Sequence, residues 1–158
     1  MPLFIVLHNV HGVQRIVDMV KVVKAFKNII STLIITKAIG AAAQSGVPEG
    51  FKIAFKENLK MIYLQDLNDI KELINPEMIY LVTPRFTEEA SKIVDLIKDI
   101  KNGKRVAIVF CGLDSGFTKS ELKLGKPLCI ENLQDYIGPV AEAAIILYEI
   151  QKTIKTEN

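Results

Sequence analysis

Apolar residues along this chain fall into two kinds of run that alternate from one end to the other. Short continuous runs are typical of strands buried on both faces, as in a parallel sheet, and they cover residues 3–7, 32–36, 61–64, 78–82, 105–110 and 128–130. Runs with helical spacing cover residues 13–27, 49–55, 67–73, 88–102 and 138–156. Because strands and helices alternate, the pattern predicts an α/β fold of three layers around a mostly parallel sheet.

Glycine, proline and capping residues predict where these elements are interrupted. The segment K-A-I-G-A-A-A-Q-S-G-V-P-E-G at 37–50 should be irregular until a short helix begins near residue 49, because Gly46 and Pro48 interrupt regular structure. Thr87 is the predicted N-cap of the helix over 88–102. Gly103 stands just past the end of that helix, where glycine is favoured.

Size and composition point to one soluble domain over residues 1–158. A chain of this length can bury its own core, and 49% apolar with 24% charged residues is usual for a globular protein. The net charge of +2 carries no overall nucleic-acid footprint, so a basic binding surface would have to be local. No run approaches the ~18 apolar residues of a membrane span, and the N-terminal stretch lacks the basic start of a signal peptide. We therefore expect a cytoplasmic protein without a membrane partner.

Cysteine and histidine are too few to suggest a metal centre. Cys111 and Cys129 are interpreted as small apolar core residues, and a disulfide is not expected in a chain without an export signal. His8 and His11 stand three residues apart, but no third ligand accompanies them. The sequence therefore predicts no metal site.

Polar residues follow the first, second and fourth predicted strands, at the edge of the sheet where open α/β folds bind ligands. Asn9 and Arg15 are the catalytic candidates, since an amide and a guanidinium could orient a phosphate or polarise a hydroxyl. The candidates for substrate contact are His8, His11, Lys37 and Arg85. For each of them the alternative, an ordinary solvated loop or helix residue, stays open.

The segment after the fifth predicted strand contains two glycines in F-C-G-L-D-S-G-F-T-K-S-E-L, residues 110–122. It has neither the order of a phosphate-binding P-loop nor that of a dinucleotide-binding fingerprint. It resembles the F-G-x-E-x-x-G-L-[ST]-x-x-E-L stretch of the SpoU branch of the SPOUT methyltransferases. The matching residues are Phe110, Gly116, Thr118, Glu121 and Leu122.

Other segments resemble the same family in the same order. L-V-T-P-R at 81–85 resembles the family's G-T-[ST]-x-R, and Y-I-G-P-V at 136–140 stands where the family has S-L-N-x-[SA]. A-I-I-L-Y-E at 144–149 resembles the family's closing A-I-x-L-Y-E. The resemblance extends along nearly the whole chain and is close in its last third.

The resemblance implies a SPOUT-like fold and an activity. Members of this family carry a deep trefoil knot, here expected over about residues 105–150, and form homodimers through the terminal helix. They transfer a methyl group from S-adenosyl-L-methionine to RNA, usually to a ribose 2′-hydroxyl of tRNA or rRNA. The cofactor would be held largely by main-chain groups of three loops, at Val82, Thr83, Phe110, Cys111, Gly112, Gly116, Cys129, Ile130, Ile137 and Gly138.

Several positions depart from the family's pattern. Leu113 stands where the family has Glu, with Asp114 one place later, and Gly138 replaces an Asn. The aligned Arg position holds Ile16, and Arg15 comes one residue early, an offset of ~100° around a helix. Main-chain contacts to a cofactor should tolerate these changes better than the chemistry at the acceptor does.

Three classes of protein remain. The preferred class is an S-adenosylmethionine-dependent RNA methyltransferase that processes tRNA or rRNA. The alternative is a SPOUT-like protein that binds RNA or the methyl donor without catalysis. The least favoured class is a RecB-like nuclease, which needs clustered acidic residues and a lysine around Mg²⁺. Glu121, Lys123 and Asp114 offer these residue types, but on a predicted loop and not on a strand.

Overall fold

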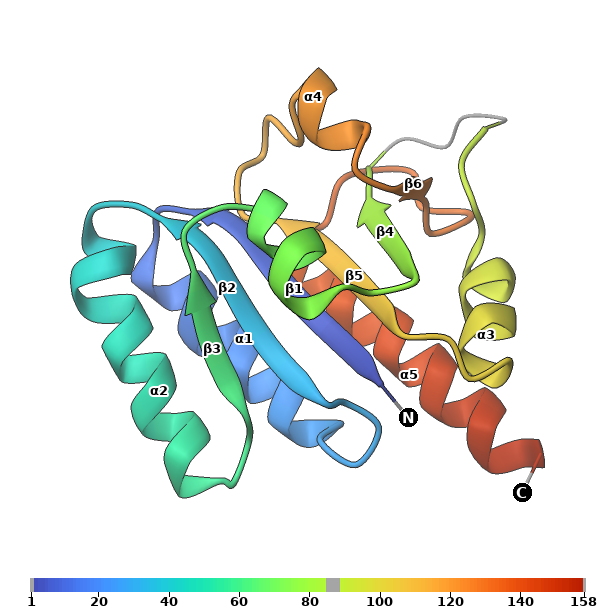
Figure 1. The fold of residues 1–158 in the computed structure, drawn as a ribbon, viewed down its shortest axis with the longest axis horizontal. Coiled ribbons are helices and arrows are strands. Elements are labelled where there is room, and N and C mark those ends of the chain that lie inside the picture. The colour runs from blue at the N-terminus through green and yellow to red at the C-terminus, as the bar shows by residue number, and fades with distance from the viewer. Residues whose placement is uncertain (1, 85–88, 158) are drawn as a thin grey trace.

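The computed structural model describes residues 2–84 and 89–157, and its centre is a parallel β-sheet (Figure 1). Within the described residues the sheet has six strands in the order β3-β2-β1-β5-β4-β6. Their bounds are Leu3–Val10 (β1), Thr32–Ala38 (β2), Met61–Leu64 (β3), Met78–Val82 (β4), Val106–Cys111 (β5) and Lys126–Leu128 (β6). Each predicted apolar run contributes a strand, with the sixth placed two residues earlier than expected. The predicted α/β class with a parallel sheet is confirmed.

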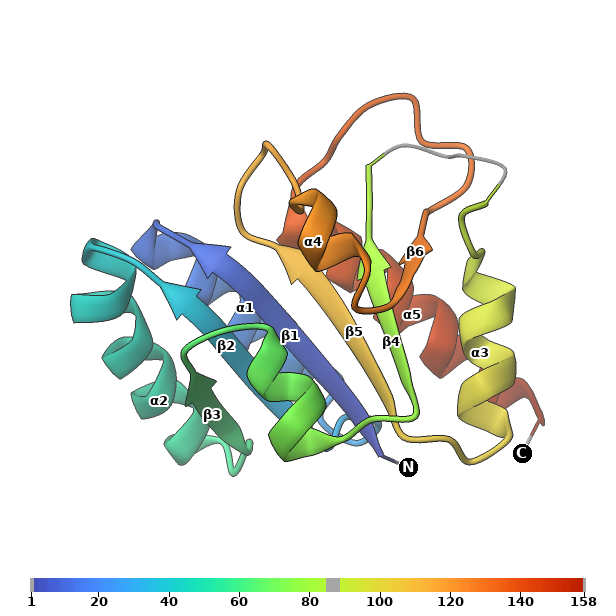
Figure 2. The same cartoon turned by 45° about the horizontal axis from the view of Figure 1, so that its top comes forward.

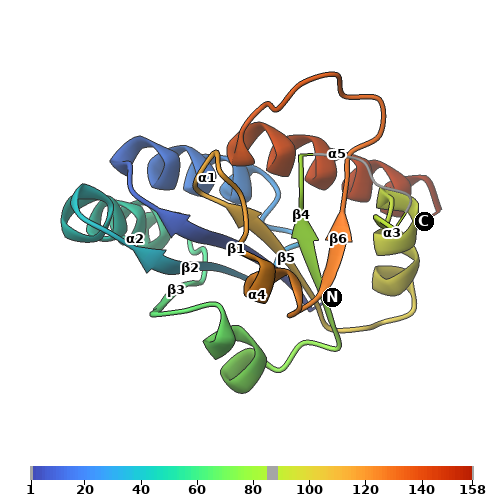
Figure 3. The same ribbon diagram turned by 90° about the horizontal axis from the view of Figure 1, so that it is seen from above.

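Helices cover the two faces of the sheet unequally. The helical elements are α1 (Val13–Ala25), η1 (Ala42–Gly46), α2 (Val47–Lys56), η2 (Ile70–Ile74), α3 (Ile93–Lys101), α4 (Lys119–Leu122) and α5 (Pro139–Glu157). Figure 3 shows α1 and α5 on one side of the sheet and the short α4 on the other. In the part of the chain that the structure describes, no helix is long and apolar enough to cross a membrane.

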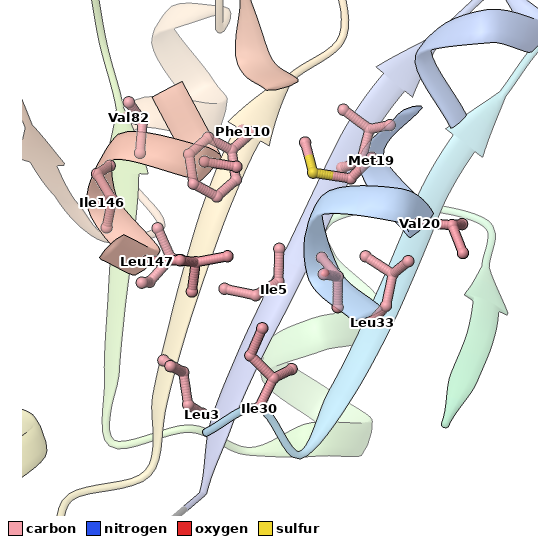
Figure 4. Close-up of a cluster of buried hydrophobic side chains, with 14 of the residues drawn as sticks. Leu3, Ile5, Met19, Val20, Ile30, Leu33, Val82, Phe110, Ile146 and Leu147 are labelled. Atoms are coloured by element: carbon pink, nitrogen blue, oxygen red, sulfur yellow. The ribbon is translucent and has the colours of Figure 1, made fainter. Parts of the chain in front are cut away.

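The main core lies between the sheet and its better covered face. Met19 of α1 and Leu147 of α5 point toward Ile5, Leu33 and Phe110 on the strands, and all five are fully buried (Figure 4). Burying such a side chain contributes roughly 1.5–3 kcal/mol. A second, smaller cluster on the opposite face joins the strands to η2 and to the segment around α4. The third predicted layer is therefore present but thin.

The segment around Gly46 and Pro48 corrects the prediction of an irregular stretch. Residues 41–56 are helical without a break, because η1 continues directly into α2. Pro48 is the second residue of α2 and directly follows the π-helical turn of η1. A Cβ on Gly46 would come within 3.0 Å of Ile16 Cδ1 and 3.3 Å of Val13 Cα. The glycine thus lets this helix approach α1 closely and does not end it.

The start of α3 also differs from the prediction. The helix begins at Ile93, and the Lys92 N–H at its N-terminus donates to Asp95 Oδ2 over 2.9 Å. Thr87, the predicted cap, lies outside the described residues. The predicted end is confirmed, since Gly103 follows α3 with φ of +78°.

Candidate functional site

The order of the strands places a topological switch point at the carboxyl ends of β1 and β5. β5 lies between β1 and β4, so the direction of the chain across the sheet reverses between β1 and β5. Ligands of open α/β sheets bind at such a switch point. The segment between β6 and α5 arches above the same edge of the sheet (Figure 2).

Arg15 reaches the turn after β5. Its Nη1 donates to the Gly112 carbonyl over 2.5 Å, and its Nη2 donates to Asp114 Oδ1 over 2.9 Å. Asn9, whose φ is +60°, accepts a hydrogen bond at Oδ1 from His11 Nε2 over 3.3 Å. A Cβ on Gly112 would lie 2.7 Å from the Asn9 carbonyl oxygen, so only glycine lets this turn lie against β1. The structure thus brings Asn9, His11 and Arg15 together at the switch point between β1 and β5.

His8 is not in a loop, as the sequence suggested, but inside β1, where it pairs with Thr36 and Cys111. Its side chain is fully buried, with Nδ1 2.7 Å from Thr36 Oγ1 and Nε2 hydrogen-bonded to Glu121 Oε2. The Phe117 ring stacks against the imidazole, with the centroids of the two rings 6.3 Å apart. The buried position leaves His8 a structural link between β1, β2 and the segment around α4.

Glu121 anchors that segment. Its Oε1 accepts the Thr118 N–H over 2.8 Å, and its own N–H donates to Thr118 Oγ1, so the two residues form a capping box at α4. Burial raises the pKa of the carboxyl, but the bonds from Thr118 and His8 outweigh burial and bring the pKa below the usual 4.5. The carboxylate is therefore charged at neutral pH.

Replacing Glu121 with alanine should lower the free energy of unfolding by about 2 kcal/mol at pH 7, because a buried imidazole loses its partner and α4 its cap. The folded pKa lies below the unfolded value, so the contact stabilises above pH 4.5 and its contribution fades as the pH falls further. Urea denaturation at pH 7 and in acid measures the effect. Lys119→Ala, at an exposed position of the same helix, is the control, and an equal loss in both variants would contradict the prediction.

Two neighbouring pockets lie between the loops at this edge. The outer pocket has a volume of about 620 Å³ and is lined by Thr83, Pro84, Glu89, Asp114, Ser115, Gly116, Phe117, Leu122 and Pro127. That volume is within the range of about 300–1,000 Å³ for small-molecule sites. The inner pocket has a volume of only about 10 Å³, room for about one water molecule, and is lined by Thr83, Pro84, Cys129, Ile130, Leu133, Asp135, Tyr136, Ile137 and Glu142. Thr83 and Pro84 line both, so the two pockets lie next to each other.

Half of the residues predicted to bind a cofactor line these pockets. They are Thr83, Gly116, Cys129, Ile130 and Ile137. The other five are not among the lining residues: Phe110 points into the core, Gly112 lies against β1, Val82 and Cys111 are buried strand residues, and Gly138 immediately precedes α5. Cys111 and Cys129 are both buried and free, as predicted, and burial raises the pKa of each thiol.

The remaining predicted residues lie apart from these pockets or outside the description. Lys37 is exposed at the end of β2, has φ of +51°, and lines a separate polar pocket of about 310 Å³ with Thr118 and Glu121. Arg85 lies outside the described residues. Among residues 2–84 and 89–157, no group of three or more His, Cys, Asp or Glu is placed to hold a metal ion.

Glu142 is a site residue that the sequence interpretation missed. It belongs to the first turn of α5, lines the inner pocket and is only 4% exposed. Burial raises the pKa of this carboxyl to about 7. The sequence carried a signal, since Glu142 shares the helical spacing of Ala143, Ile146, Leu147 and Ile150, and in the structure all five are buried. An acidic residue in an otherwise apolar stripe marks a buried carboxyl.

Comparison with solved structures defines the class of fold. A candidate methylase family protein of Haemophilus influenzae Rd KW20 superimposes with a TM-score of 0.74 at 12% identity, over 99% of this chain and 68% of the other. The SpoU methyltransferase AviRb of Streptomyces viridochromogenes, in complex with AdoMet, has a TM-score of 0.71 at 11% identity, over 96% of this chain and 60% of the other. The chain therefore has the α/β fold of the SPOUT methyltransferases.

Comparison of sequences defines the family. Residues 40–149 match the family described as RecB-family nuclease (DUF2122), and the chain belongs to that family. A candidate type II restriction enzyme of Aeropyrum pernix is 38% identical over 90% of this chain and 88% of its own length. Another, of Methanocaldococcus jannaschii, is 33% identical over 96% of this chain and 98% of its own length.

These findings correct the predicted function. The expectation of an S-adenosylmethionine-dependent RNA methyltransferase is contradicted, because the family and both relatives are described as nucleases or restriction enzymes. The class ranked last on the sequence is the one that the family description names. The resemblance to the SpoU branch correctly indicated the fold and was wrong about the activity, since one fold serves many chemistries.

Proposed function

We propose that this protein binds S-adenosyl-L-methionine in the outer pocket, beside the inner one. The observation that carries the proposal is the position of the pockets, between the same three loops that the resemblance assigned to the cofactor. AviRb, which shares the fold, was solved in complex with AdoMet. At 11% identity that likeness concerns the fold alone, so the ligand is our inference for this chain.

The residues present fit such a ligand. Gly116 has φ of +81°, and nothing lies within 4 Å of where its Cβ would be, so its main chain is open to the pocket. Phe117, Leu122 and Pro127 offer apolar surface of the kind that a nucleobase covers. Asp114 supplies carboxylate oxygens that could accept hydrogen bonds from ribose hydroxyls.

We further propose that the chain is knotted where these loops meet. The Thr83 N–H donates to the Leu128 carbonyl over 2.8 Å, and on the other side the Ser91 N–H donates to the Pro127 carbonyl over 2.7 Å. The Cys129 N–H returns a bond to the Ser91 carbonyl over 3.0 Å. β6 thus runs between the two ends of one loop, which supports a deep trefoil knot. Such a knot is an exception to the rule that protein chains are unknotted. Such threading would hold the pocket in its binding shape.

Isothermal titration of the purified protein with S-adenosyl-L-methionine tests the proposed binding. We expect saturable binding that is weakened at least tenfold in Gly116→Trp, because the indole would fill the outer pocket. Gly103→Trp is a matched control: Gly103 also has positive φ and open space around it, but it lies at the end of α3. No binding by the wild type, or equal weakening in both variants, would refute the proposal.

Phosphodiester cleavage is a second candidate function, favoured by membership of the nuclease family. Glu121 and Lys123 are the residues we would test, although Glu121 is bonded to His8 and Thr118. Duplex DNA and RNA are incubated with the protein and Mg²⁺ or Mn²⁺. Cleavage should be lost in Glu121→Gln and Lys123→Ala and kept in Lys119→Ala. Activity that survives both substitutions would exclude these residues as the catalytic ones.

RNA and a second copy of the chain are the partners we propose. Arg15, His11 and Lys37 lie at the edge of the sheet and could contact a nucleic-acid backbone. Tyr148 on α5 is 58% exposed, and Ile137 in the preceding loop is 39% exposed, as an interface formed by the terminal helix would require. Sedimentation of the wild type and Tyr148→Glu tests the dimer, with loss of dimer expected in the variant.

A further inference from the structure

Two aromatic side chains are exposed on α2, at the rim of the sheet away from β6 (Figure 1). Phe55 is 85% exposed, more than any other large apolar side chain among the described residues, and Phe51, one turn earlier, is 37% exposed. Both line an apolar pocket of about 400 Å³ together with Thr32 and Met61, the first residues of β2 and β3. The pocket therefore lies at the amino ends of these strands, whereas the proposed cofactor pocket lies at the carboxyl edge of the sheet.

Three exposed lysines border this aromatic pair. Lys52 and Lys56 each follow one of the phenylalanines on α2, and Lys60 lines the apolar pocket itself. Among the described residues none of the three ammonium groups has a hydrogen-bond or ion-pair partner. The neighbouring acid Glu57 does not neutralise them, because it is paired with Lys24 over 3.6 Å. The border of the aromatic pair is thus positively charged.

The end of α2 does not require these lysines. A lysine in the last turn of a helix can complement the free carbonyl groups there. At α2 a lysine from another segment already does so, since Lys27 Nζ donates to the Glu57 carbonyl over 3.0 Å. The unpaired ammonium groups beside the phenylalanines are therefore available to a ligand.

A polar pocket lies next to the apolar one, since Leu59 and Lys60 line both. It also has a volume of about 400 Å³, and its other lining residues include Lys27, Asn28, Ser31 and Asn58. Ammonium, amide and hydroxyl groups can all donate hydrogen bonds to phosphate oxygens. A planar apolar group and an anionic group rich in oxygen can thus be held side by side.

We infer that this face, formed by Phe51, Lys52, Phe55, Lys56 and Lys60, binds a single strand of nucleic acid. Bases of a single strand stack on exposed aromatic side chains, while basic residues contact its phosphates. In a duplex the bases are stacked on one another and are not free to cover Phe55. A protein partner fits less well, because lysine is depleted in protein–protein interfaces. The face is separate from the cofactor pocket and from the backbone contacts proposed at the carboxyl edge, and it depends on neither.

Fluorescence anisotropy with a labelled oligouridylate of about ten nucleotides, within the usual range of single-strand site sizes, tests the inference. Phe55→Ala should weaken binding roughly tenfold, because one stacked base is lost. The same strand annealed to oligoadenylate should bind the wild type more weakly than the free strand does. Val94→Ala is the matched control, since Val94 is an apolar residue of α3 that is 65% exposed, and it should keep the wild-type affinity.

The dependence of binding on salt separates stacking from phosphate contacts. In Lys56→Ala the slope of log K against log salt should shrink by about 0.7, the value for one phosphate of a single strand, whereas Phe55→Ala should keep the wild-type slope. Lys98→Ala, at an exposed lysine of α3, is the control and should also keep it.

Wild-type affinity in Phe55→Ala, or an equal change of slope in Lys56→Ala and Lys98→Ala, would overturn the inference. Failure of the wild type to bind the oligonucleotide would overturn it as well and would leave this face to a protein partner. Titration with S-adenosyl-L-methionine is a separate measurement, so the proposed cofactor binding stands or falls independently.

Discussion

Replacement of Gly125 by alanine is expected to destabilise the protein by about 3 kcal/mol or more. A Cβ at this position would lie 2.2 Å from the Ile79 carbonyl oxygen and 2.9 Å from Ile79 Cβ. Ile79 cannot retreat, because it pairs with Ala107 inside the ladder between β4 and β5. The clash could be relieved only by moving β6 away from β4, which breaks the pairing of Leu81 with Pro127.

Urea denaturation followed by circular dichroism measures the effect of Gly125→Ala. The control is Gly12→Ala, at a position with φ of −96° and nothing within 4 Å of the added methyl group. Gly12 is the N-cap of α1, so the control should cost under about 1 kcal/mol. If the two variants lost the same stability, the close approach of β6 to β4 would not be a determinant of the fold.

Replacement of Glu142 by glutamine should raise the free energy of unfolding, whereas Gly125→Ala lowers it. The size of the increase should depend on pH. The carboxyl pKa is 4.5 when unperturbed and about 7 in the folded protein. The folded state therefore binds the proton more tightly, so the wild type loses stability as the pH rises from 4.5 through 7. At about 1.4 kcal/mol per pKa unit the full loss is about 3 kcal/mol. The amide carries no charge and avoids this loss.

Denaturation of the wild type and Glu142→Gln at pH 4.5 and pH 8.5 measures the difference. The two proteins should be nearly equal in acid, and the variant should be more stable by about 3 kcal/mol at pH 8.5. Glu131→Gln, at a half-exposed acid, should show little dependence on pH. A constant difference between the wild type and Glu142→Gln at both pH values would show that Glu142 does not titrate in this range.

The sequence predicted the strands well because each is buried on both faces and so forms a continuous apolar run. It could not predict the helix through Gly46 and Pro48, since that depends on how closely α1 approaches, a contact between segments distant in sequence. The same limit affected His8, whose partners Thr36 and Glu121 are 28 and 113 residues away.

At the site, the departures from the SpoU pattern proved to be connected. In the sequence pattern Arg15 is offset by ~100° around the helix, and Asp114 stands one place late. In the structure these two displaced residues form an ion pair with each other. A one-dimensional pattern treats them as two separate mismatches, whereas in three dimensions the second compensates the first. Glu142 was missed for a simpler reason, because it was treated as part of an apolar helix and not as a buried acid.

The hydrogen bonds of Ser91 to β6 also affect how this sheet meets other molecules. A strand at the rim of a sheet exposes unpaired N–H and carbonyl groups, which can template aggregation with another chain. β6 is the last strand on its side of the sheet. Its outer edge is nevertheless occupied, because the backbone of Ser91 forms hydrogen bonds with Pro127 and Cys129. The opposite rim is β3, only four residues long. The fold thus closes one rim with its own loop and keeps the other too short to recruit a neighbour's strand.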